Sequence, residues 1–234
     1  MSASRLKGKP LLEINNLPII CHVVKKAKET DIGKVIVATE DKEIMTAVEK
    51  NGGKVILTGK HNTGTDRIFE AFQKLKTKDV DYVLNLQGDE PMIDPKDIIN
   101  LNNLMIKNNS EIGTLASEIK HNTILNNENV VKVITKEKLE KNSFTKAINF
   151  SRKNLSKQNS NIYHHIGIYA YKISVLEKFI NLNQTKNEIE NHLEQLRALD
   201  NNITIMVALA KSSPIGIDTK EDYLAIKKIM EYKS

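Results

Sequence analysis

The chain has 234 residues, of which 40% are hydrophobic and 27% charged, so it can bury a sizeable core and is neither disordered nor fibrous. Its formal charge of +6 comes from lysines spread along the chain rather than from a basic block, so we expect no nucleic-acid partner. A site for phosphates or acidic small molecules explains the positive charge equally well. No apolar run approaches the roughly 18 residues of a membrane span and no signal peptide is present, which predicts a cytoplasmic protein without membrane insertion.

Strands and helices alternate in the first part of the chain, which is typical of βαβ units and a mostly parallel sheet. The expected helices cover residues 18–30, 43–50 and 66–76, and the expected strands cover residues 34–39, 54–57 and 82–86. Such sheets bind ligands beyond the carboxyl ends of their strands. The segment Gln87-Gly88-Asp89-Glu90-Pro91 follows the last of these strands and is therefore a candidate site.

The pattern is looser after residue 110. We expect strands at residues 130–135, 147–150, 166–171 and 203–210, helices at residues 174–180, 189–199 and 220–232, and a polar linker at residues 153–161. No internal repeat is visible. We expect one domain over residues 1–234, with a small lobe at about 130–200.

Thr219 is expected to cap the C-terminal helix, with Glu221 and Asp222 in the first turn, where acidic residues suit the helix dipole. Asp218 would then sit at a strand-to-helix corner. Cys21 is the only cysteine and lies in an apolar run, so a buried structural thiol is expected and no internal disulfide can form.

The N-terminal segment places Arg5 and Lys9 around Gly8 before any regular element. A glycine turn lets backbone amides approach phosphates, while the lysine supplies a point charge and the arginine a bidentate fork. A solvated basic terminus explains the same residues equally well.

Asp89 follows a predicted strand and is a hard oxygen ligand suited to Mg²⁺. The alternative is a turn aspartate that bonds nearby amides. Asp218 could supply a second carboxylate, or it could only shape the start of a helix. Spacing alone does not separate these alternatives.

Two further segments are ambiguous. Thr63-Gly64-Thr65-Asp66-Arg67 opens a predicted helix, where free amides favour an anion or a base edge, yet an ordinary helix cap explains it as well. His164 and His165 precede a glycine-containing strand without the spacing of a zinc site, so they are either polar groups lining a cleft or turn residues.

Taken in order, several segments resemble the 3-deoxy-manno-octulosonate cytidylyltransferases, also called CMP-Kdo synthetases. The matching segments are Ser4-Arg5-Leu6…Gly8-Lys9-Pro10-Leu11, Val37-Ala38-Thr39, Thr63-Gly64-Thr65-Asp66-Arg67, Asn85-Leu86-Gln87-Gly88-Asp89-Glu90-Pro91, Phe150-Ser151-Arg152, His165-Ile166-Gly167-Ile168-Tyr169, Leu193-Glu194-Gln195-Leu196-Arg197 and Ile217-Asp218-Thr219. Each is short, but their common order is specific. The resemblance implies a Rossmann-like nucleotide-diphospho-sugar transferase fold, a mostly parallel sheet flanked by helices, with a small β-containing lobe.

The reaction that the resemblance implies is attack of the anomeric hydroxyl of 3-deoxy-manno-octulosonate (Kdo) on the α-phosphorus of CTP, which gives CMP-Kdo for lipopolysaccharide biosynthesis and releases pyrophosphate. Asp89 and Asp218 would hold Mg²⁺ as the cofactor, while Arg5 and Lys9 would neutralise the triphosphate. Lys9, Asp89 and Asp218 are thus the expected catalytic residues.

The resemblance also implies a set of substrate-binding residues and a homodimer. Thr63, Gly64 and Arg67 would flank the cytidine. Arg152 would pair with the carboxylate of the sugar. The remaining residues expected in the sugar pocket are Gln87, His165, Tyr169, Glu194 and Gln195.

The chain departs from the family pattern in two places. The family begins with an apolar strand ending in Pro-Ala-Arg, whereas this chain opens with Met1-Ser2-Ala3, so that strand and one phosphate-facing arginine are expected to be missing. After Arg152, Lys153-Asn154-Leu155-Ser156 replaces a proline-containing turn. Two alternatives stay open: a cytidylyltransferase for another acidic sugar, of the acylneuraminate type, and a catalytically silent nucleotide-sugar binding module.

Overall fold

The computed structural model describes residues 6, 8–77, 79–120, 122–154, 161–212 and 216–232. The chain forms two compact units: Met1–Asp79, Asn85–Ile98 and Pro214–Ser234 make the first, and Val80–Leu84 with Ile99–Ser213 make the second. The small lobe expected at residues 130–200 falls inside the second unit. The strand expected before Ser4 and most of the linker expected at residues 153–161 concern residues outside those described.

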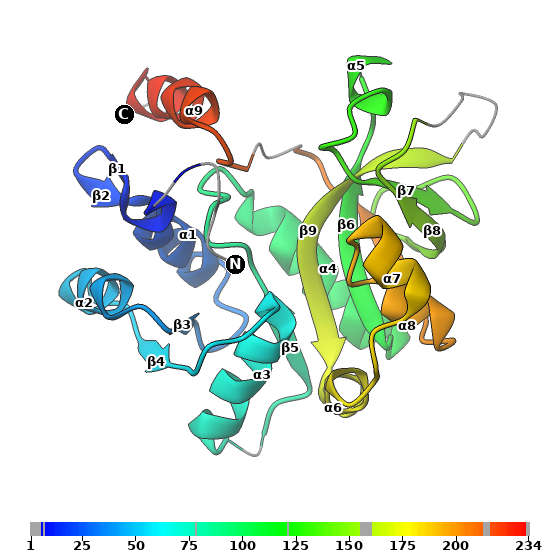
Figure 1. The fold of residues 1–234 in the computed structure, drawn as a ribbon, viewed down its shortest axis with the longest axis horizontal. Coiled ribbons are helices and arrows are strands. Elements are labelled where there is room, and N and C mark those ends of the chain that lie inside the picture. Colours follow the sequence, from blue (N-terminus) through cyan, green and yellow to red (C-terminus); the bar gives the residue numbers. More distant parts are fainter. Residues whose placement is uncertain are drawn as a thin grey trace. The chain divides into compact units, whose positions relative to one another are not determined.

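The first unit begins with a short hairpin and a βαβ element (Figure 1). Its elements are the 3₁₀ turn η1 (Lys9–Leu11), β1 (Glu13–Ile14), β2 (Leu17–Pro18), α1 (Ile19–Lys28), β3 (Val37–Thr39), α2 (Lys42–Lys50), β4 (Val55–Leu57), α3 (Gly64–Leu75) and α9 (Lys220–Tyr232). Strands β3 and β4 pair in parallel, with α2 as the crossover helix, which confirms the predicted βαβ pattern. At the tip of the β1–β2 hairpin, Asn15 and Asn16 adopt positive φ angles of 50° and 59°, as primed hairpin turns require.

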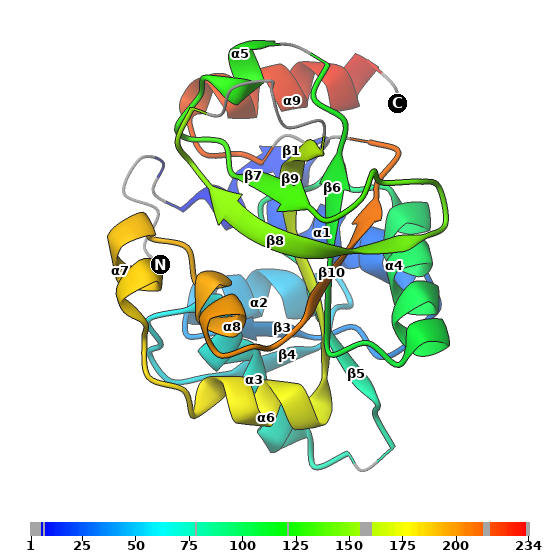
Figure 2. The ribbon, with the colours of Figure 1, turned by 90° about the vertical axis from the view of Figure 1, so that its right-hand side faces the viewer.

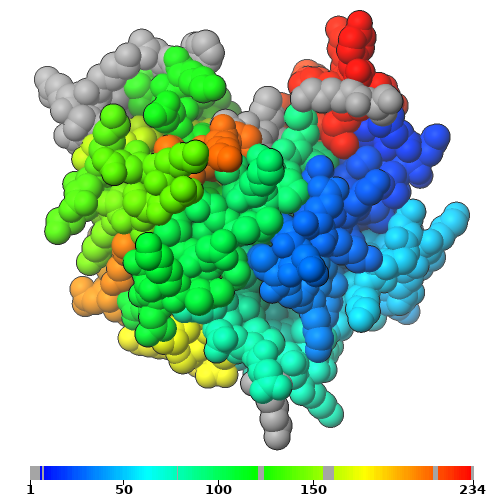
Figure 3. Space-filling view, turned by 180° about the vertical axis from the view of Figure 1, so that it is seen from behind, coloured from blue at the N-terminus to red at the C-terminus, as the bar shows by residue number. Residues whose placement is uncertain are grey.

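Aliphatic side chains from distant parts of the sequence form the core of the first unit. Ile14, Ile19, Ile217 and Ile226 are fully buried together, so α9 packs on the N-terminal hairpin and α1. Figure 3 shows this contact from behind, with α9 in red beside the dark blue N-terminal residues. A second cluster joins Cys21 to Ile20 and Val48, which confirms the prediction of a buried thiol.

The second unit is built on a six-stranded sheet in the order β5-β9-β6-β10-β8-β7, and β7 also pairs with β9, so the sheet curls back on itself (Figure 2). Its strands are β5 (Tyr82–Asn85), β6 (Ile112–Ser117), β7 (Lys132–Thr135), β8 (Phe144–Ser151), β9 (Ile162–Lys172) and β10 (Ile205–Leu209). Its helices are α4 (Pro95–Asn108, which begins in the first unit), α5 (Asn122–Leu125), α6 (Ile173–Ile180), α7 (Lys186–Asn191) and α8 (Leu196–Asp200).

This sheet is mixed rather than mostly parallel, which corrects the expected fold class. Strand β10 runs parallel to β6, but the pairs β6–β9, β10–β8, β7–β8 and β7–β9 are antiparallel. The physical reason is the connections. The consecutive strands β7 and β8 show this: no helix is described between them, and a parallel pair of consecutive strands needs a long crossover.

The helix predicted at residues 189–199 is wrong, because it is two short helices separated by a turn. His192 adopts a left-handed conformation with φ of 52° and ends α7, and α8 starts four residues later at Leu196. Residues Leu193 to Gln195 therefore lie in a turn. The sequence interpretation also missed α4 and β6; all six residues of β6 are buried. None of the described helices is long and apolar enough to cross a membrane.

Gly113 in β6 has no room for a side chain. A Cβ atom there would overlap Sδ of Met105 and lie 3.0 Å from Cδ1 of Leu101, and both residues are fully buried on α4. We expect Gly113→Ala to lower the free energy of unfolding by about 1–3 kcal/mol through overpacking. Calorimetric melting against Gly33→Ala, where no atom lies within 4 Å, measures this effect. Equal melting temperatures for the two variants would contradict the prediction.

Candidate functional site

One lysine and two aspartates meet in the first unit. The Lys9 ammonium donates hydrogen bonds to Oδ2 of Asp89 and, at 3.1 Å, to Oδ1 of Asp218. The side chain of Lys9 is only 13% exposed, whereas that of Asp218 is 70% exposed. The structure thus brings together the three residues that we expected to be catalytic.

The backbone around these residues explains why they converge. Gly8 has a φ of 67°, a left-handed turn that leads directly into η1 and Lys9. Ile217 is buried in the core of the first unit, and its amide donates to the carbonyl of Asp89 at 3.1 Å. This bond holds the two aspartate-bearing segments side by side.

Asp218 immediately precedes a helix cap. The amide of Asp222 donates to the Thr219 hydroxyl at 3.1 Å, and the Asp222 carboxylate accepts from the amides of Asp218 and Thr219 at 3.2 and 2.9 Å. The predicted cap at Thr219 is confirmed. Thr219 and Asp222 provide the hydrogen bonds of the helix cap, so the carboxylate of Asp218 is available to accept the hydrogen bond from Lys9. No strand is described at Gly216 and Ile217, so the expected strand-to-helix corner is a loop-to-helix corner.

The charges around Lys9 set its protonation state. Burial alone would lower the pKa of the Lys9 ammonium, but its ion pairs with Asp89 and Asp218 raise that pKa above the ordinary value. The neighbouring Glu90 behaves in the opposite way: burial, together with the negative charges of Asp89 and Asp218, raises the pKa of its carboxyl to about 8. Its Oε2 atom has no hydrogen-bond partner in the described part of the chain. Lys9 is therefore charged and Glu90 largely protonated at neutral pH.

The two carboxylates that surround Lys9 could also bind a divalent cation. Two carboxylates already converge on one positive charge, and Mg²⁺ is usually held by one or two carboxylates together with substrate phosphates and water. No group of three or more His, Cys, Asp or Glu side chains able to hold a metal occurs among the described residues. The residues fit a metal that is bound jointly with a phosphorylated ligand rather than a closed structural site.

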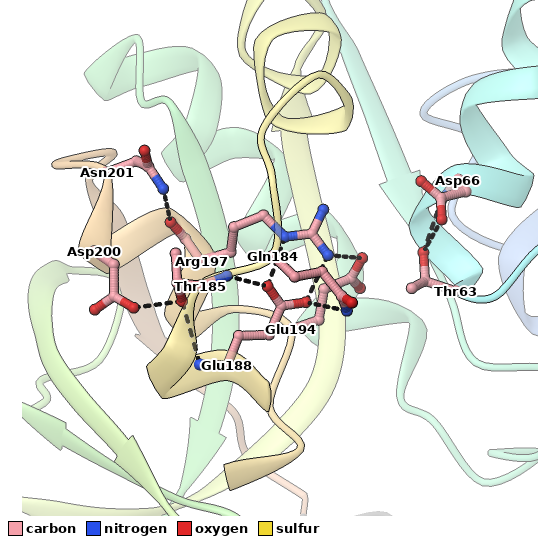
Figure 4. A network of polar contacts seen from close by, with 9 residues as sticks. All are labelled: Thr63, Asp66, Gln184, Thr185, Glu188, Glu194, Arg197, Asp200 and Asn201. Atoms are coloured by element: carbon pink, nitrogen blue, oxygen red, sulfur yellow. Dashed lines mark hydrogen bonds and ion pairs between the residues drawn. The ribbon is translucent and has the colours of Figure 1, made fainter. Parts of the chain in front are cut away.

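The predicted nucleotide-binding segment forms the start of α3. The Thr63 hydroxyl accepts from the Asp66 amide at 3.1 Å and donates to the Asp66 carboxylate at 2.9 Å, so it caps this helix (Figure 4). The Arg67 guanidinium donates to the Thr58 hydroxyl at 3.0 Å and lies 3.6 Å from the Glu40 carboxylate. Gly64 occupies the first helical position. Arg5 lies outside the described residues.

Gln87 stands in the turn after β5. Its carbonyl accepts from the Glu90 amide at 3.4 Å, and a Cβ atom on the next residue, Gly88, would lie 3.0 Å from Ile20. The close approach of Ile20 explains why glycine occupies this place in the Gln-Gly-Asp segment.

The second unit contains the other residues that were expected to bind the sugar. Two of them, His165 and Tyr169, lie in an aromatic cluster on β9. The His165 ring meets the Phe150 ring edge-on at 5.1 Å between centroids and lies 5.4 Å from the Tyr169 ring. Burial, with the charges of His164 and Arg152, lowers the pKa of His165 to about 3, so its imidazole is neutral. The Tyr169 hydroxyl is buried without a hydrogen-bond partner in the described part of the chain.

Arg152 and Lys132 make hydrogen bonds to backbone carbonyls near the C-terminal end of β8. Lys132 is fully buried in β7, and its ammonium donates to the carbonyl of Arg152 at 2.6 Å and to that of Asn127 at 3.1 Å. The Arg152 guanidinium donates to the carbonyl of Asn129 at 2.9 Å. The backbone at Arg152 is therefore anchored by a buried cation that the sequence interpretation missed.

Glu194 lies beside a buried ion pair. Arg197 donates two hydrogen bonds to the Glu188 carboxylate, from Nε at 2.8 Å and from Nη2 at 2.5 Å, and its Nη2 lies 3.9 Å from Oε1 of Glu194 (Figure 4). Gln195 sits at the start of α8, and its carbonyl accepts from the Ala198 amide at 3.2 Å. Glu188 and Arg197 therefore shape the turn that carries Glu194 and Gln195.

The sequence interpretation missed several polar residues around these sites. They are Thr114, Lys132 and Glu188, while Glu90 and Arg197 were quoted only as parts of longer segments, without a role of their own. A signal existed for Lys132 and Thr114, since each is a polar residue inside a strand of buried residues, but β6 itself was not predicted. Glu188 and Arg197 are nine residues apart, and nothing in the sequence pattern indicated that they pair.

Comparisons with known proteins show the family to which the chain is similar. The model of a family described as cytidylyltransferase matches residues 1–205. The 3-deoxy-manno-octulosonate cytidylyltransferase of Bartonella tribocorum is 39% identical over 98% of this chain and 95% of its own length, and that of Thermodesulfovibrio yellowstonii is 42% identical over 97% and 94%. A solved structure of CMP:2-keto-3-deoxy-manno-octonic acid synthetase complexed with CTP superposes with a TM-score of 0.89 at 33% identity, covering 99% of this chain and 95% of that one.

More distant structures share the fold alone. An apo UDP-glucose pyrophosphorylase superposes with a TM-score of 0.73 at 14% identity over the whole of this chain and 96% of that one. The fold is therefore that of α/β nucleotidyltransferases. With relatives near 40% identity over almost the whole length, the chain belongs to the 3-deoxy-manno-octulosonate cytidylyltransferase family.

Proposed function

We propose that this chain is a nucleotidyltransferase that joins Kdo to CMP, using CTP and releasing pyrophosphate. The observation that carries the proposal is the Lys9–Asp89–Asp218 group, which sits on a scaffold similar to a synthetase solved with CTP. Phosphoryl-type transfer depends mainly on positioning and on neutralising the charge that develops on the phosphate oxygens. The buried ammonium of Lys9 supplies a positioned positive charge, and the two carboxylates would supply the rest of the neutralisation by holding a divalent cation.

The proposal assigns roles to this chain's own residues. Asp89 and Asp218 would hold Mg²⁺, which when bound would neutralise charge on the phosphates. Lys9 exchanges part of its carboxylate contacts for phosphate oxygens and, with its raised pKa, stays charged while doing so. Arg5, outside the described residues, and Arg67 with Thr63 and Gly64 would contact the nucleotide.

Residues of the second unit are proposed to contact the acidic sugar. The Arg152 guanidinium supplies a bidentate partner for a carboxylate. His165 and Tyr169 present a neutral imidazole and a buried hydroxyl, and Glu194 and Gln195 lie on the turn that the buried Arg197 supports. Gln87 of the first unit is proposed as a further sugar contact.

The reaction assay tests the proposal directly. We expect pyrophosphate release when the full chain receives CTP, Mg²⁺ and Kdo, little release with N-acetylneuraminate, and none without a sugar. Release with N-acetylneuraminate but not Kdo would instead make the chain an acylneuraminate-type enzyme. CTP binding by calorimetry, combined with no release for either sugar, would identify a silent binding module.

We also propose that the chain acts in the cytoplasm as a homodimer. CTP is a cytoplasmic metabolite, and the dimer rests on the resemblance to the family. Light scattering of the full chain at assay concentration tests the dimer, and a mass of only the 26.4 kDa monomer would refute it.

A further inference from the structure

A buried hydroxyl in the sheet of the second unit contacts the ring of His165. Thr114 lies in the middle of β6 and is fully buried. Its Oγ1 atom is 2.7 Å from the carbonyl oxygen of Ile168, 3.3 Å from that of Ile166 and 3.0 Å from Nε2 of His165. Three partners thus surround a group that has one proton to donate.

A bulge in β9 creates this arrangement. Thr114 is in register with Tyr169, but the next residue, Leu115, is in register with Ile166, so Gly167 and Ile168 fall out of the ladder. A bulge interrupts the regular backbone hydrogen bonds and re-aims nearby groups. The two carbonyls that face Thr114 come from the residues on either side of Gly167.

The protons can be placed by donor and acceptor counting. Carbonyl oxygens only accept, so the Thr114 proton goes to Ile168, the nearer of the two. The contact with His165 then requires the ring nitrogen to be the donor and the hydroxyl oxygen the acceptor. With its lowered pKa the ring carries one proton, and that proton is on Nε2. Nδ1 is left with its lone pair.

We propose that Thr114 is a positioning residue that fixes His165 as the Nε2–H tautomer, so that Nδ1 can accept a hydrogen bond from a hydroxyl group of the substrate. The part that concerns the substrate rests on the proposed function; the tautomer does not. Phe150 and Tyr169 pack on the ring and limit its rotation, which keeps Nδ1 in one orientation. A histidine of the other tautomer would offer a donor at that position and repel a group that donates.

Long-range ¹H–¹⁵N NMR spectra of the full chain test the tautomer without any substrate. The signals of His165 are identified among those of the six histidines by their loss in a His165→Gln variant. We expect a pyrrole-type shift at Nε2 and a pyridine-type shift at Nδ1 for His165, unchanged across neutral pH. A pyridine-type Nε2 or a charged ring in the unmodified chain overturns the inference, whatever the variants do.

Variants of Thr114 provide the second arm. Thr114→Val keeps the shape but removes the hydroxyl, so the two tautomers should mix; Thr114→Ser keeps the hydroxyl and should retain the original spectrum. In the assay, Thr114→Val should raise KM for the sugar about tenfold with KM for CTP unchanged, and Thr114→Ser should restore it. An unchanged His165 spectrum in a folded Thr114→Val overturns the inference. Failure of the unmodified chain to turn over any sugar contradicts the proposed function instead and leaves the spectral result standing.

Discussion

Asp89→Asn should lower turnover by a factor of at least about 100 to 1,000, the loss typical of removing one electrostatic contact to a reacting phosphate or oxyanion. The substitution keeps the shape of the side chain but removes a charge that faces Lys9 and that we propose binds the metal. The backbone carbonyl of Asp89 still accepts from Ile217, so the fold should persist. Pyrophosphate release at saturating CTP and sugar measures the effect, and thermal melting checks the fold.

A matched control comes from the same unit. Asp41 caps α2 by accepting from the amides of Glu43 and Ile44, and asparagine caps a helix about as well as aspartate. Asp41→Asn therefore removes the same charge without touching the proposed site and should leave turnover within about twofold. If Asp89→Asn kept the turnover of this control, the metal and phosphate assignment at Asp89 would be wrong.

The first unit was largely predictable because its signals are local. The strand and helix boundaries from residue 18 to residue 75 agree with the structure to within a few residues, since each helix has an amphipathic face and each strand a β-branched run. The cap at Thr219 follows from a hydroxyl three residues before an acid. That Lys9, Asp89 and Asp218 lie together could not be obtained from spacing alone and came from the ordered resemblance to a family.

The second unit was less predictable because its structure depends on contacts between distant residues. Strand β6 is buried on both faces and begins after a long helix, so it lacks the alternation that marks a strand. The break at His192 contradicts the helical periodicity around it, and a buried pair compensates for it: Glu188 on α7 and Arg197 on α8 face each other across the turn. The antiparallel pairing of β7 and β8 follows from the short connection between them. The hydrophobic periodicity of a strand gives no information about the direction of its neighbour.

Arg197→Met should lower the free energy of unfolding by about 3–5 kcal/mol at neutral pH. Both members of the Arg197–Glu188 pair are buried, with side chains only 5% and 4% exposed, and Arg197 also lies 4.8 Å from the centre of the Phe179 ring. Methionine fills similar space but leaves the Glu188 carboxylate charged, buried and short of two strong donors. Chemical denaturation of the full chain measures the loss.

The matched control is Lys186→Met, which breaks an exposed pair with Glu190 on the same helix and should cost less than about 0.5 kcal/mol. A double variant, Arg197→Met with Glu188→Leu, should recover much of the loss, because replacing both members of a buried pair with apolar groups is often neutral. A loss as small as that of Lys186→Met would mean that the pair does not hold the α7–α8 turn.

The pH dependence of the same variant separates lost charge pairing from lost packing. Burial alone would raise the pKa of Glu188, but the hydrogen bonds from Arg197 and Gln184 hold it below the ordinary value of 4.5. The stability that this group contributes is therefore present above pH 4.5 and is lost as the pH falls through the lower folded-state value. In Arg197→Met burial acts without that compensation, so Glu188 should take up a proton at higher pH and the difference from the unmodified chain should shrink on acidification. A difference that stays constant from pH 7 to pH 4 would assign the loss to packing against Phe179 and not to the charge pair.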